Sequence, residues 1–290
     1  MSKMNPLVSV IIPHYNSPVL LRKLLLSIPK REEIQIIVVD DNSTKETEVY
    51  EACMKEFGEE ITFLKNTSGQ KGAGSSRNIG LKAAKGTWLL FADADDFFLD
   101  TLWDILVKYV DKEADMIFFI PTSIHLETGQ ESDRHRYSRT LIEDYLEKQD
   151  AKSKAVLQYG FDSPWSKLIR RKIVEENQIV FDTTKVANDV MFSARCAVCA
   201  KEIMASRDTF YCITRGTGTL ATTGGEENFD IRRAVWEDKY QYLKEKLSKE
   251  EWNALDMRGG FWIRRTRRNH YGILKVCKVT AELIGKGIRL

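Results

Sequence analysis

The sequence lacks any run of ~18 or more apolar residues, which is the length that a membrane-spanning helix needs. Its first residues, Met-Ser-Lys-Met-Asn-Pro, also lack the apolar core of a secretory signal. We therefore expect a cytoplasmic protein, bound at most peripherally to the inner face of the membrane. Basic and acidic residues nearly balance, at 44 and 42 of 290, and 43% of the residues are hydrophobic. This composition predicts a globular chain without extensive disorder.

A disulfide framework is not expected, because the cysteines are few, odd in number and scattered through apolar surroundings. They are Cys53, Cys196, Cys199, Cys212 and Cys277. Cys196-x-x-Cys199 resembles half of a zinc site, but no second pair and no histidine stand at ligand spacing. Reduced, mostly buried thiols are therefore the favoured interpretation.

The usual nucleotide-binding loops are incomplete. No Gly-Lys-Ser/Thr sequence follows a glycine-rich loop, which excludes a P-loop. Gly72-Ala-Gly74 precedes a predicted helix, as in dinucleotide-binding folds, but Arg77 stands where the third glycine would allow close packing. A dinucleotide-dependent oxidoreductase is thus only a secondary alternative.

The first part of the chain alternates strand and helix signals. Strands are predicted over residues 7–12, 34–39, 61–64, 87–92 and 115–121, with helices from Ser17-Pro18, from 43 to about 57, and over 75–85. This βαβ alternation predicts an α/β fold with a mostly parallel sheet flanked by helices. After residue 121 the pattern loosens. Residues 203–215 resemble a strand, 215–225 a loop, and 228–290 a helical extension.

Polar clusters follow three of the predicted strands. They are Pro13-His-Tyr-Asn16, Asp40-Asp-Asn-Ser43 and Asp93-Ala-Asp-Asp96. Because the carboxyl ends of parallel strands share one edge of the sheet, these side chains should converge. Three carboxylates in the last cluster suit a hard cation such as Mg²⁺ or Mn²⁺ bound with substrate phosphates. The alternative is an acidic turn in which Asp96 or Asp100 caps the next helix.

Residues 261–270, Phe-Trp-Ile-Arg-Arg-Thr-Arg-Arg-Asn-His, interleave aromatic and basic side chains. This pattern is compatible with peripheral contact with a membrane surface or a polyanion. It equally suits a helix that packs on the domain with a solvated basic face. We expect no nucleic-acid partner.

Four motifs, in order and on the expected elements, resemble the family 2 glycosyltransferases, which are inverting enzymes of the GT-A (Rossmann-like) fold that use nucleotide-activated sugars. These motifs are Val8-Ser-Val-Ile-Ile-Pro-His-Tyr-Asn16, Ile37-Val-Val-Asp-Asp-Asn-Ser43, Gly74-Ser-Ser-Arg-Asn-Ile-Gly80 and Asp93-Ala-Asp-Asp96. Weaker likenesses follow at 164–170, 179–182 and 188–192. Most relatives carry Glu-Asp where this chain has Asn188-Asp189.

The resemblance implies a set of donor-binding residues. Asp41 would accept a hydrogen bond from the base, Pro13 and Tyr15 would lie against the base or ribose, and Arg77 would meet phosphates or fix the acidic residues. Asp93 would approach the ribose or a metal-bound water, and Asp95 would bind Mn²⁺ or Mg²⁺. Asp96 would support either role or only cap a helix, and Asp93 or Asp41 could instead form a structural ion pair with Arg77.

The resemblance also assigns Asp189 as the catalytic base, with Asn188 beside it as support and Trp165 as an acceptor-side aromatic residue. A carboxylate at a helix start should stay ionised, and the neutral Asn188 should lower the pKa of Asp189 slightly. Capping by Asp189 and plain burial of Trp165 are the structural alternatives.

The implied organisation is one domain with an extension: residues 1–121 are the half that binds the nucleotide sugar, 122–225 are the acceptor-binding half of the same domain, and 226–290 form the C-terminal helical extension. The implied reaction is metal-dependent transfer, with inversion, of a sugar from a nucleotide donor. A UDP-hexose is the expected donor, and a glycan or lipid-linked oligosaccharide of surface polysaccharide synthesis the expected acceptor. A non-catalytic nucleotide- or glycan-binding module on the same scaffold is the alternative.

Overall fold

The computed structural model describes residues 6–216 and 225–290. At its centre is a seven-stranded sheet in the order β3-β2-β1-β4-β8-β6-β9. The strands are β1 (Val8–His14), β2 (Ile34–Asp40), β3 (Ile61–Lys65), β4 (Trp88–Phe91), β6 (Met116–Phe119), β8 (Lys167–Arg170) and β9 (Ile203–Ser206). β8 is antiparallel to both of its neighbours, β4 and β6, whereas the other neighbouring pairs are parallel. The predicted α/β fold with a mostly parallel sheet is confirmed.

The parallel strands form where the sequence has apolar and β-branched runs. Every residue of β4 and β6 is buried, as expected for strands covered on both faces. The helices up to residue 160 are α1 (Pro18–Leu26), α2 (Thr47–Phe57), α3 (Ala73–Ala83), α4 (Leu102–Tyr109), α5 (Arg136–Lys148) and α6 (Ala151–Gly160). Gly86 lets the chain return to the sheet, because a Cβ there would lie 2.4 Å from the Ser9 nitrogen.

Two predicted segments differ from the structure. The helix expected from residue 43 begins only at Thr47, because Ser43 donates hydrogen bonds to the Asp40 carboxylate and forms a turn there. The strand-like residues 203–215 form two strands in different sheets, β9 and β10 (Tyr211–Arg215). β10 joins β5 (Phe97–Phe98) and β7 (Thr122–His125) in a three-stranded sheet that the sequence did not indicate. The loop expected at 215–225 lies mostly outside the described residues.

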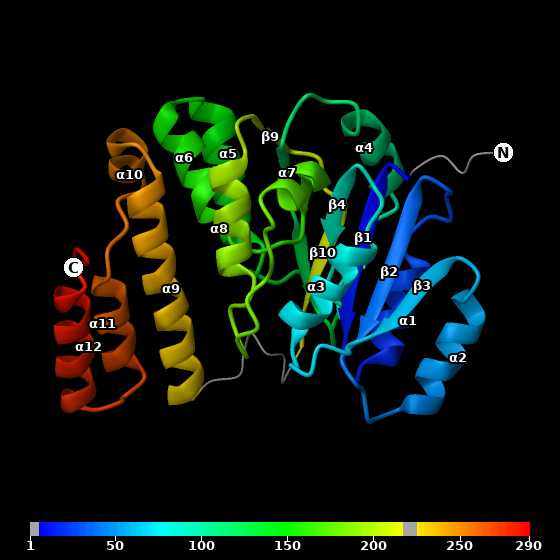
Figure 1. Ribbon diagram of the computed structural model, residues 1–290, viewed down its shortest axis with the longest axis horizontal. Coiled ribbons are helices and arrows are strands. Elements are labelled where there is room, and N and C mark those ends of the chain that lie inside the picture. The colour runs from blue at the N-terminus through cyan, green and yellow to red at the C-terminus, as the bar shows by residue number, and fades with distance from the viewer. Residues whose placement is uncertain (1–5, 217–224) are drawn as a thin grey trace.

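The remaining helices are α7 (Arg171–Glu176), α8 (Val190–Cys199), α9 (Glu226–Lys246), α10 (Lys249–Leu255), α11 (Gly260–Arg268) and α12 (Ile273–Gly285). α9 packs against α8, and α9 to α12 form a layer at one end of the molecule, with α12 outermost (Figure 1). This predicted helical extension has its own apolar cluster, which includes Phe229, Tyr240, Trp262 and Leu283. None of the described helices is long and apolar enough to cross a membrane.

Three of the cysteines, Cys53, Cys196 and Cys212, are buried, as expected, whereas Cys277 is exposed on α12. Cys196 lies within α8, and the half-buried Cys199 lies at the end of the same helix, where packing was expected. All five thiols are free in the structure.

Candidate active site

The acidic cluster follows β4 at the carboxyl edge of the sheet. One ligand oxygen from each of Asp93, Asp95 and Asp96 lies within 4.8 Å of the others. The turn is closed by a backbone hydrogen bond of 3.0 Å from the Asp96 nitrogen to the Asp93 oxygen. Three carboxylates at this spacing repel one another, and a bound cation or a proton reduces that repulsion.

Asp96 is buried and connects this turn to β10. Its carboxylate accepts hydrogen bonds from the Tyr211 hydroxyl at 2.6 Å and from the Thr214 backbone nitrogen at 2.7 Å. Thr214 Oγ1 also donates to the Asp95 carbonyl at 2.6 Å. Burial, followed by the nearby carboxylates, raises the pKa of Asp96 well above its usual value. Asp96 does not cap α4, because Thr101 occupies the N-cap position.

Asp95 is only half-buried, and no other described side chain donates a hydrogen bond to its carboxylate. Burial and the adjacent Asp93 carboxylate raise the pKa of Asp95 to about 6, an effect that the Arg134 guanidinium partly opposes. An ionised Asp95 therefore gains from a neighbouring cation. Carboxylate oxygens are the ligands that Mg²⁺ and Mn²⁺ prefer, so the donor set fits either ion.

Arg77, near the start of α3, fixes Asp93 in place. Its Nη2 donates to Asp93 Oδ1 at 2.6 Å, and its Nη1 donates to Asn188 Oδ1 at 2.9 Å. The guanidinium is buried and faces the ring of Phe181 at 5.3 Å. Two roles were expected for Arg77, binding phosphates or fixing the acidic residues, and these contacts describe the second. Through Asn188, Arg77 also joins segments that are more than a hundred residues apart in sequence.

Asp41 lies at the end of β2 and is likewise occupied by neighbours. Its carboxylate accepts hydrogen bonds from Asn66 Nδ2 at 2.5 Å and from the Gly72 nitrogen at 2.7 Å. Both donors belong to the segment between β3 and α3, so Asp41 shapes that segment. A base N–H would be a further donor to the same carboxylate, which retains lone pairs for it.

Asp40 holds the first strand to the second. His14, which is buried, contacts Asp40 Oδ1 through Nδ1 at 2.9 Å and accepts the Ser17 N–H at Nε2. These contacts fix the end of β1, which includes Pro13, and the turn after it, which carries Tyr15. The Tyr15 side chain is 50% exposed at this edge and is free to meet a ligand.

Asp189 stands immediately before α8. Its backbone carbonyl accepts a hydrogen bond from the Ser193 nitrogen, but its side chain does not cap the helix. Burial raises the pKa of Asp189, and the positive charge of Arg77 opposes that shift. Burial is the larger effect, so the pKa of Asp189 lies above its ordinary value. The expected slight lowering by a neutral Asn188 compares it with a glutamate at that position and stays a prediction.

Asn188 is buried against α3 and receives Arg77 on its amide oxygen. A Cβ on Gly74 would lie 2.0 Å from the Asp182 carbonyl and 3.0 Å from the Asn188 Cβ. Gly74 is therefore explained by close contact between α3 and the segment before α8. No dinucleotide is needed to account for this glycine.

Trp165 is buried, with 7% of its surface exposed. Its indole stacks on the ring of Tyr211, with centroids 5.9 Å apart and planes 16° apart, and meets Phe161 edge-on. These contacts therefore describe Trp165 as a buried packing residue. A contact with the acceptor remains a prediction.

Two features near these residues were not found from the sequence. Tyr211 and Thr214 anchor the acidic turn, but β10 could not be assigned to that turn by pattern alone. Lys167 is fully buried, with Nζ 2.8 Å from the Phe161 carbonyl and 3.4 Å from Ser193 Oγ. Burial lowers the pKa of Lys167 to about 8. The sequence signal for this buried lysine was its position at the start of an apolar strand, Lys167–Arg170.

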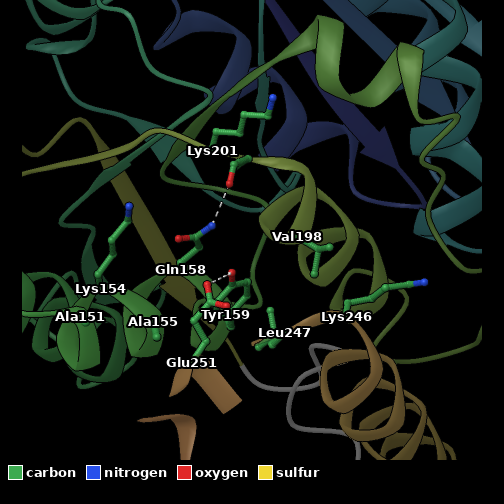
Figure 2. Close-up of a pocket in the computed structure, with 11 residues that line it drawn as sticks. Ala151, Lys154, Ala155, Gln158, Tyr159, Val198, Lys201, Lys246, Leu247 and Glu251 are labelled. Carbon is green, nitrogen blue, oxygen red and sulfur yellow. Dashed lines mark hydrogen bonds between the residues drawn. The ribbon is translucent and has the colours of Figure 1, made fainter. Parts of the chain in front are cut away.

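A cavity of about 350 Å³ lies away from the acidic cluster, where α6 meets the far end of α8 and the start of α10. Figure 2 shows the Gln158 amide reaching toward the end of α8 and Tyr159 beside Glu251. The Gln158 amide donates to the Ala200 carbonyl at 3.1 Å, and the Tyr159 hydroxyl donates to Glu251 at 3.1 Å. None of the expected site residues lines this cavity.

Comparison with known proteins adds an independent finding. The model of the family described as "Glycosyl transferase family 2" matches residues 9–177, more than half of the chain. The chain is 28% identical over 247 residues to the poly(ribitol-phosphate) beta-N-acetylglucosaminyltransferase TarS of Staphylococcus aureus, covering 78% of this chain and 39% of TarS. It is 26% identical over 258 residues to the glycosyltransferase GlyG of Streptococcus pneumoniae, covering 84% of this chain and 81% of GlyG.

Solved structures show the same fold. The crystal structure of S. aureus TarS in complex with UDP-GlcNAc superimposes with a TM-score of 0.67 at 22% identity, covering 91% of this chain and 74% of that one. A mannosyltransferase from Pyrobaculum calidifontis, in complex with GDP-Man and Mn²⁺, gives a TM-score of 0.58 at 14% identity. That match covers 97% of this chain and 80% of the other. The chain spans about two fifths of the full length of TarS.

Proposed function

Because the chain belongs to glycosyl transferase family 2, we propose that it transfers a sugar from a nucleotide donor to an acceptor hydroxyl, with inversion at the anomeric carbon. The observation that carries this proposal is the clustering of Asp93, Asp95 and Asp96 within 4.8 Å at the carboxyl edge of the sheet. Arg77 links that cluster to the segment that carries Asp189.

We propose that Asp95, assisted by Asp93, holds a Mn²⁺ or Mg²⁺ ion, which would neutralise charge on the leaving nucleoside diphosphate. Arg77 keeps Asp93 in position rather than reaching the phosphates. Asp96 acts through Tyr211 and Thr214, because both of its oxygens are engaged in holding the turn to β10.

Asp189 is the proposed general base, which takes the proton from the acceptor hydroxyl as that oxygen attacks the anomeric carbon. Burial raises its pKa, and a carboxylate with a raised pKa is a stronger base. Asn188 supports it by receiving Arg77 and so fixing the start of α8. An α-linked donor then gives a β-linked product.

For the donor, we propose a UDP-hexose, with Pro13, Tyr15 and Asp41 at the base and ribose. TarS, whose structure contains UDP-GlcNAc, supports this choice, and the mannosyltransferase with GDP-Man makes GDP the leading alternative nucleotide. The proposed acceptor is a glycan or a lipid-linked oligosaccharide of a surface polysaccharide. Relatives that act on poly(ribitol-phosphate) support a cell-surface polymer. We assign donor binding to residues 1–121, acceptor binding to 122–225 and the helical extension to 226–290.

Isothermal titration with UDP, GDP and dTDP, each with and without Mn²⁺, tests this proposal without needing the acceptor. We expect one nucleotide to bind, and to bind more tightly with Mn²⁺. Asp95→Asn should remove the Mn²⁺ effect, whereas Asp104→Asn, an exposed carboxylate on α4, should keep it. Absence of binding by the folded protein to all three nucleotides would favour the non-catalytic alternative.

A further inference from the structure

The outermost helix, α12, has a buried apolar face and, on its opposite side, an exposed apolar stripe beside Lys278. Val276, Val279 and Leu283 are buried and pack toward α9 and α11. The opposite side is exposed and carries Leu274, Cys277, Ala281 and Ile284 at helical spacing. Figure 1 shows α12 at the far end of the molecule, with nothing outside it. An exposed apolar stripe on a helix at the edge of a protein is unusual unless a membrane or another protein covers it.

The stripe is most apolar at its first turn. Ile273 and Leu274 are 71% and 84% exposed, and they directly follow the short turn that joins α11 to α12. Two adjacent aliphatic side chains with this exposure cannot both be explained by packing against the domain.

Basic residues stand at the end of α11 and in the turn that leads to these two side chains. Arg267 and Arg268 are exposed in the last turn of α11, and His270 is exposed in the turn. In the described parts of the chain, neither arginine forms an ion pair. The aromatic residues that first indicated a membrane-contacting segment are, by contrast, turned inward, since Trp262 is buried and Phe261 packs against it. We call Arg267, Arg268, His270, Ile273 and Leu274 the α11–α12 tip.

The α11–α12 tip lies at the same end of α9 as the proposed base. Lys275, at the start of α12, contacts Glu226 at 2.9 Å and Asp230 at 2.5 Å in the first turns of α9. Glu227 in that first turn contacts Lys185 at 2.8 Å, and Lys185 precedes Asp189 by four residues. In Figure 1 the turn between α11 and α12 and the start of α9 both lie at the lower end of the view.

We propose that the α11–α12 tip docks on the surface of a bilayer that contains anionic lipids. Ile273 and Leu274 would enter the boundary between headgroups and acyl chains, while the arginines would meet lipid phosphates. A second copy of this chain fits less well, because pairing two tips would bring their unpaired cations together. The contact is peripheral and does not depend on the proposed reaction. It would bring the edge that carries Asp189 close to a lipid-borne substrate.

The first measurement is co-flotation of the full chain with vesicles of phosphatidylcholine alone and of phosphatidylcholine with one third phosphatidylglycerol. We expect binding to the anionic vesicles only, and a loss of binding as the NaCl concentration rises. Failure to bind the anionic vesicles at low salt would overturn the proposal. This readout requires no donor, so it is distinguishable from failure of the proposed transferase function.

Two double variants locate the contact. Ile273→Ser with Leu274→Ser, and Arg267→Glu with Arg268→Glu, should each weaken vesicle binding by about tenfold or more. A matched control is Val19→Ser with Leu26→Ser, which removes two aliphatic side chains of α1 that are 59% and 55% exposed. A further control is Lys55→Glu with Lys82→Glu, which reverses two exposed charges elsewhere. Both controls should bind vesicles as the unaltered chain does.

Because all the altered side chains are exposed, each variant should keep its circular dichroism spectrum and melting temperature. Equal loss of binding in tip and control variants would overturn the assignment to this surface. Analytical ultracentrifugation without lipid tests the alternative, in which a second copy of the chain covers the stripe. A dimer that the tip variants abolish would show that a second copy covers the stripe and would overturn the membrane proposal.

Discussion

At the scale of single residues, Arg77 determines how the acidic edge is arranged. One guanidinium holds Asp93 with one nitrogen and Asn188 with another, in a buried position where such charge-assisted hydrogen bonds are strong. The proposed metal ligands and the proposed base therefore share one rigid support. Neutral Asn188 leaves the positive charge of Arg77 less compensated than a carboxylate there would, and this charge lowers the pKa of Asp189 against the effect of burial.

The role of Asp189 can be tested by Asp189→Asn. We expect the turnover of sugar transfer to fall by about a hundredfold or more while donor affinity stays unchanged, because only proton removal is lost. For the unaltered chain, activity should fall with decreasing pH at a higher pH than an ordinary carboxylate would give, since burial raises the pKa of Asp189. Glu227→Gln, at an exposed carboxylate, is the matched control. Normal transfer by Asp189→Asn would remove it as the base.

Because Lys167 is buried, we expect the free energy of unfolding to depend on pH. Its pKa in the folded chain is about 8, below the unperturbed value of 10.5. Between these two pH values the unfolded chain binds more protons, so the free energy of unfolding should rise with pH in that window. The total gain should be about 3 kcal/mol relative to Lys167→Met, in which this ionisation is absent. Urea denaturation of both proteins at several pH values between 7.5 and 10 measures the difference. A difference that does not change with pH would contradict the depressed pKa.

At the scale of elements, the acidic turn depends on β10, a strand that follows it by more than a hundred residues. The Tyr211 hydroxyl donates to Asp96 and accepts the Asp93 N–H at 3.0 Å, and Thr214 donates to the same turn. β10 is therefore part of the site although it carries no proposed ligand. The small sheet of β5, β10 and β7 holds the turn after β4 in one conformation.

Replacing Tyr211 by phenylalanine tests this support. Tyr211→Phe leaves the buried Asp96 short of one donor, which should lower the free energy of unfolding by about 1–3 kcal/mol. It should also weaken the Mn²⁺-dependent part of nucleotide binding, because the turn loses its anchor. Tyr137→Phe, at an exposed tyrosine of α5, is the control for removing a hydroxyl. Unchanged stability and unchanged Mn²⁺ dependence would show that the hydroxyl does not support the turn.

At the scale of the whole molecule, the central sheet cannot be divided at residue 121. β8 comes from the proposed acceptor-binding part, yet it lies between β4 and β6 of the donor-binding part. By contrast, α11 and α12 pack with α9 in a separate apolar cluster that includes Trp262 and Leu283. α9 and α10 also share a second apolar cluster with α6 and α8. We therefore expect α11 and α12 to open separately from the sheet, whereas α9 and α10 stay attached to it.

The variant Trp262→Ala tests this division. Removing a buried indole should lower the local stability of the extension by about 3–5 kcal/mol. Hydrogen exchange should then accelerate at amides of α11 and α12 and remain unchanged at amides of β1 and β2. Equal acceleration in both regions would show that the extension and the sheet open as one unit.

The features that the sequence determined by itself are those that depend on neighbouring residues in the chain. Strand and helix periodicities, together with turn residues, act over a few neighbours, so the order of elements and the mostly parallel sheet could be predicted. The rule that parallel strands end at one edge predicted a shared position for the clusters at 13–16, 40–43 and 93–96. The three carboxylates after β4 predicted a cation site without any tertiary information.

Only the tertiary structure decided which partners these residues have. The pairing of Arg77 with Asn188 and that of Asp96 with Tyr211 join segments more than a hundred residues apart, and no local pattern encodes such contacts. The same holds for the direction of the pKa of Asp189, because its burial depends on surrounding segments and outweighs the positive charge of Arg77. In the extension, packing turned Trp262 inward and left Ile273 and Leu274 outside, since helical spacing alone does not say which apolar face meets the core.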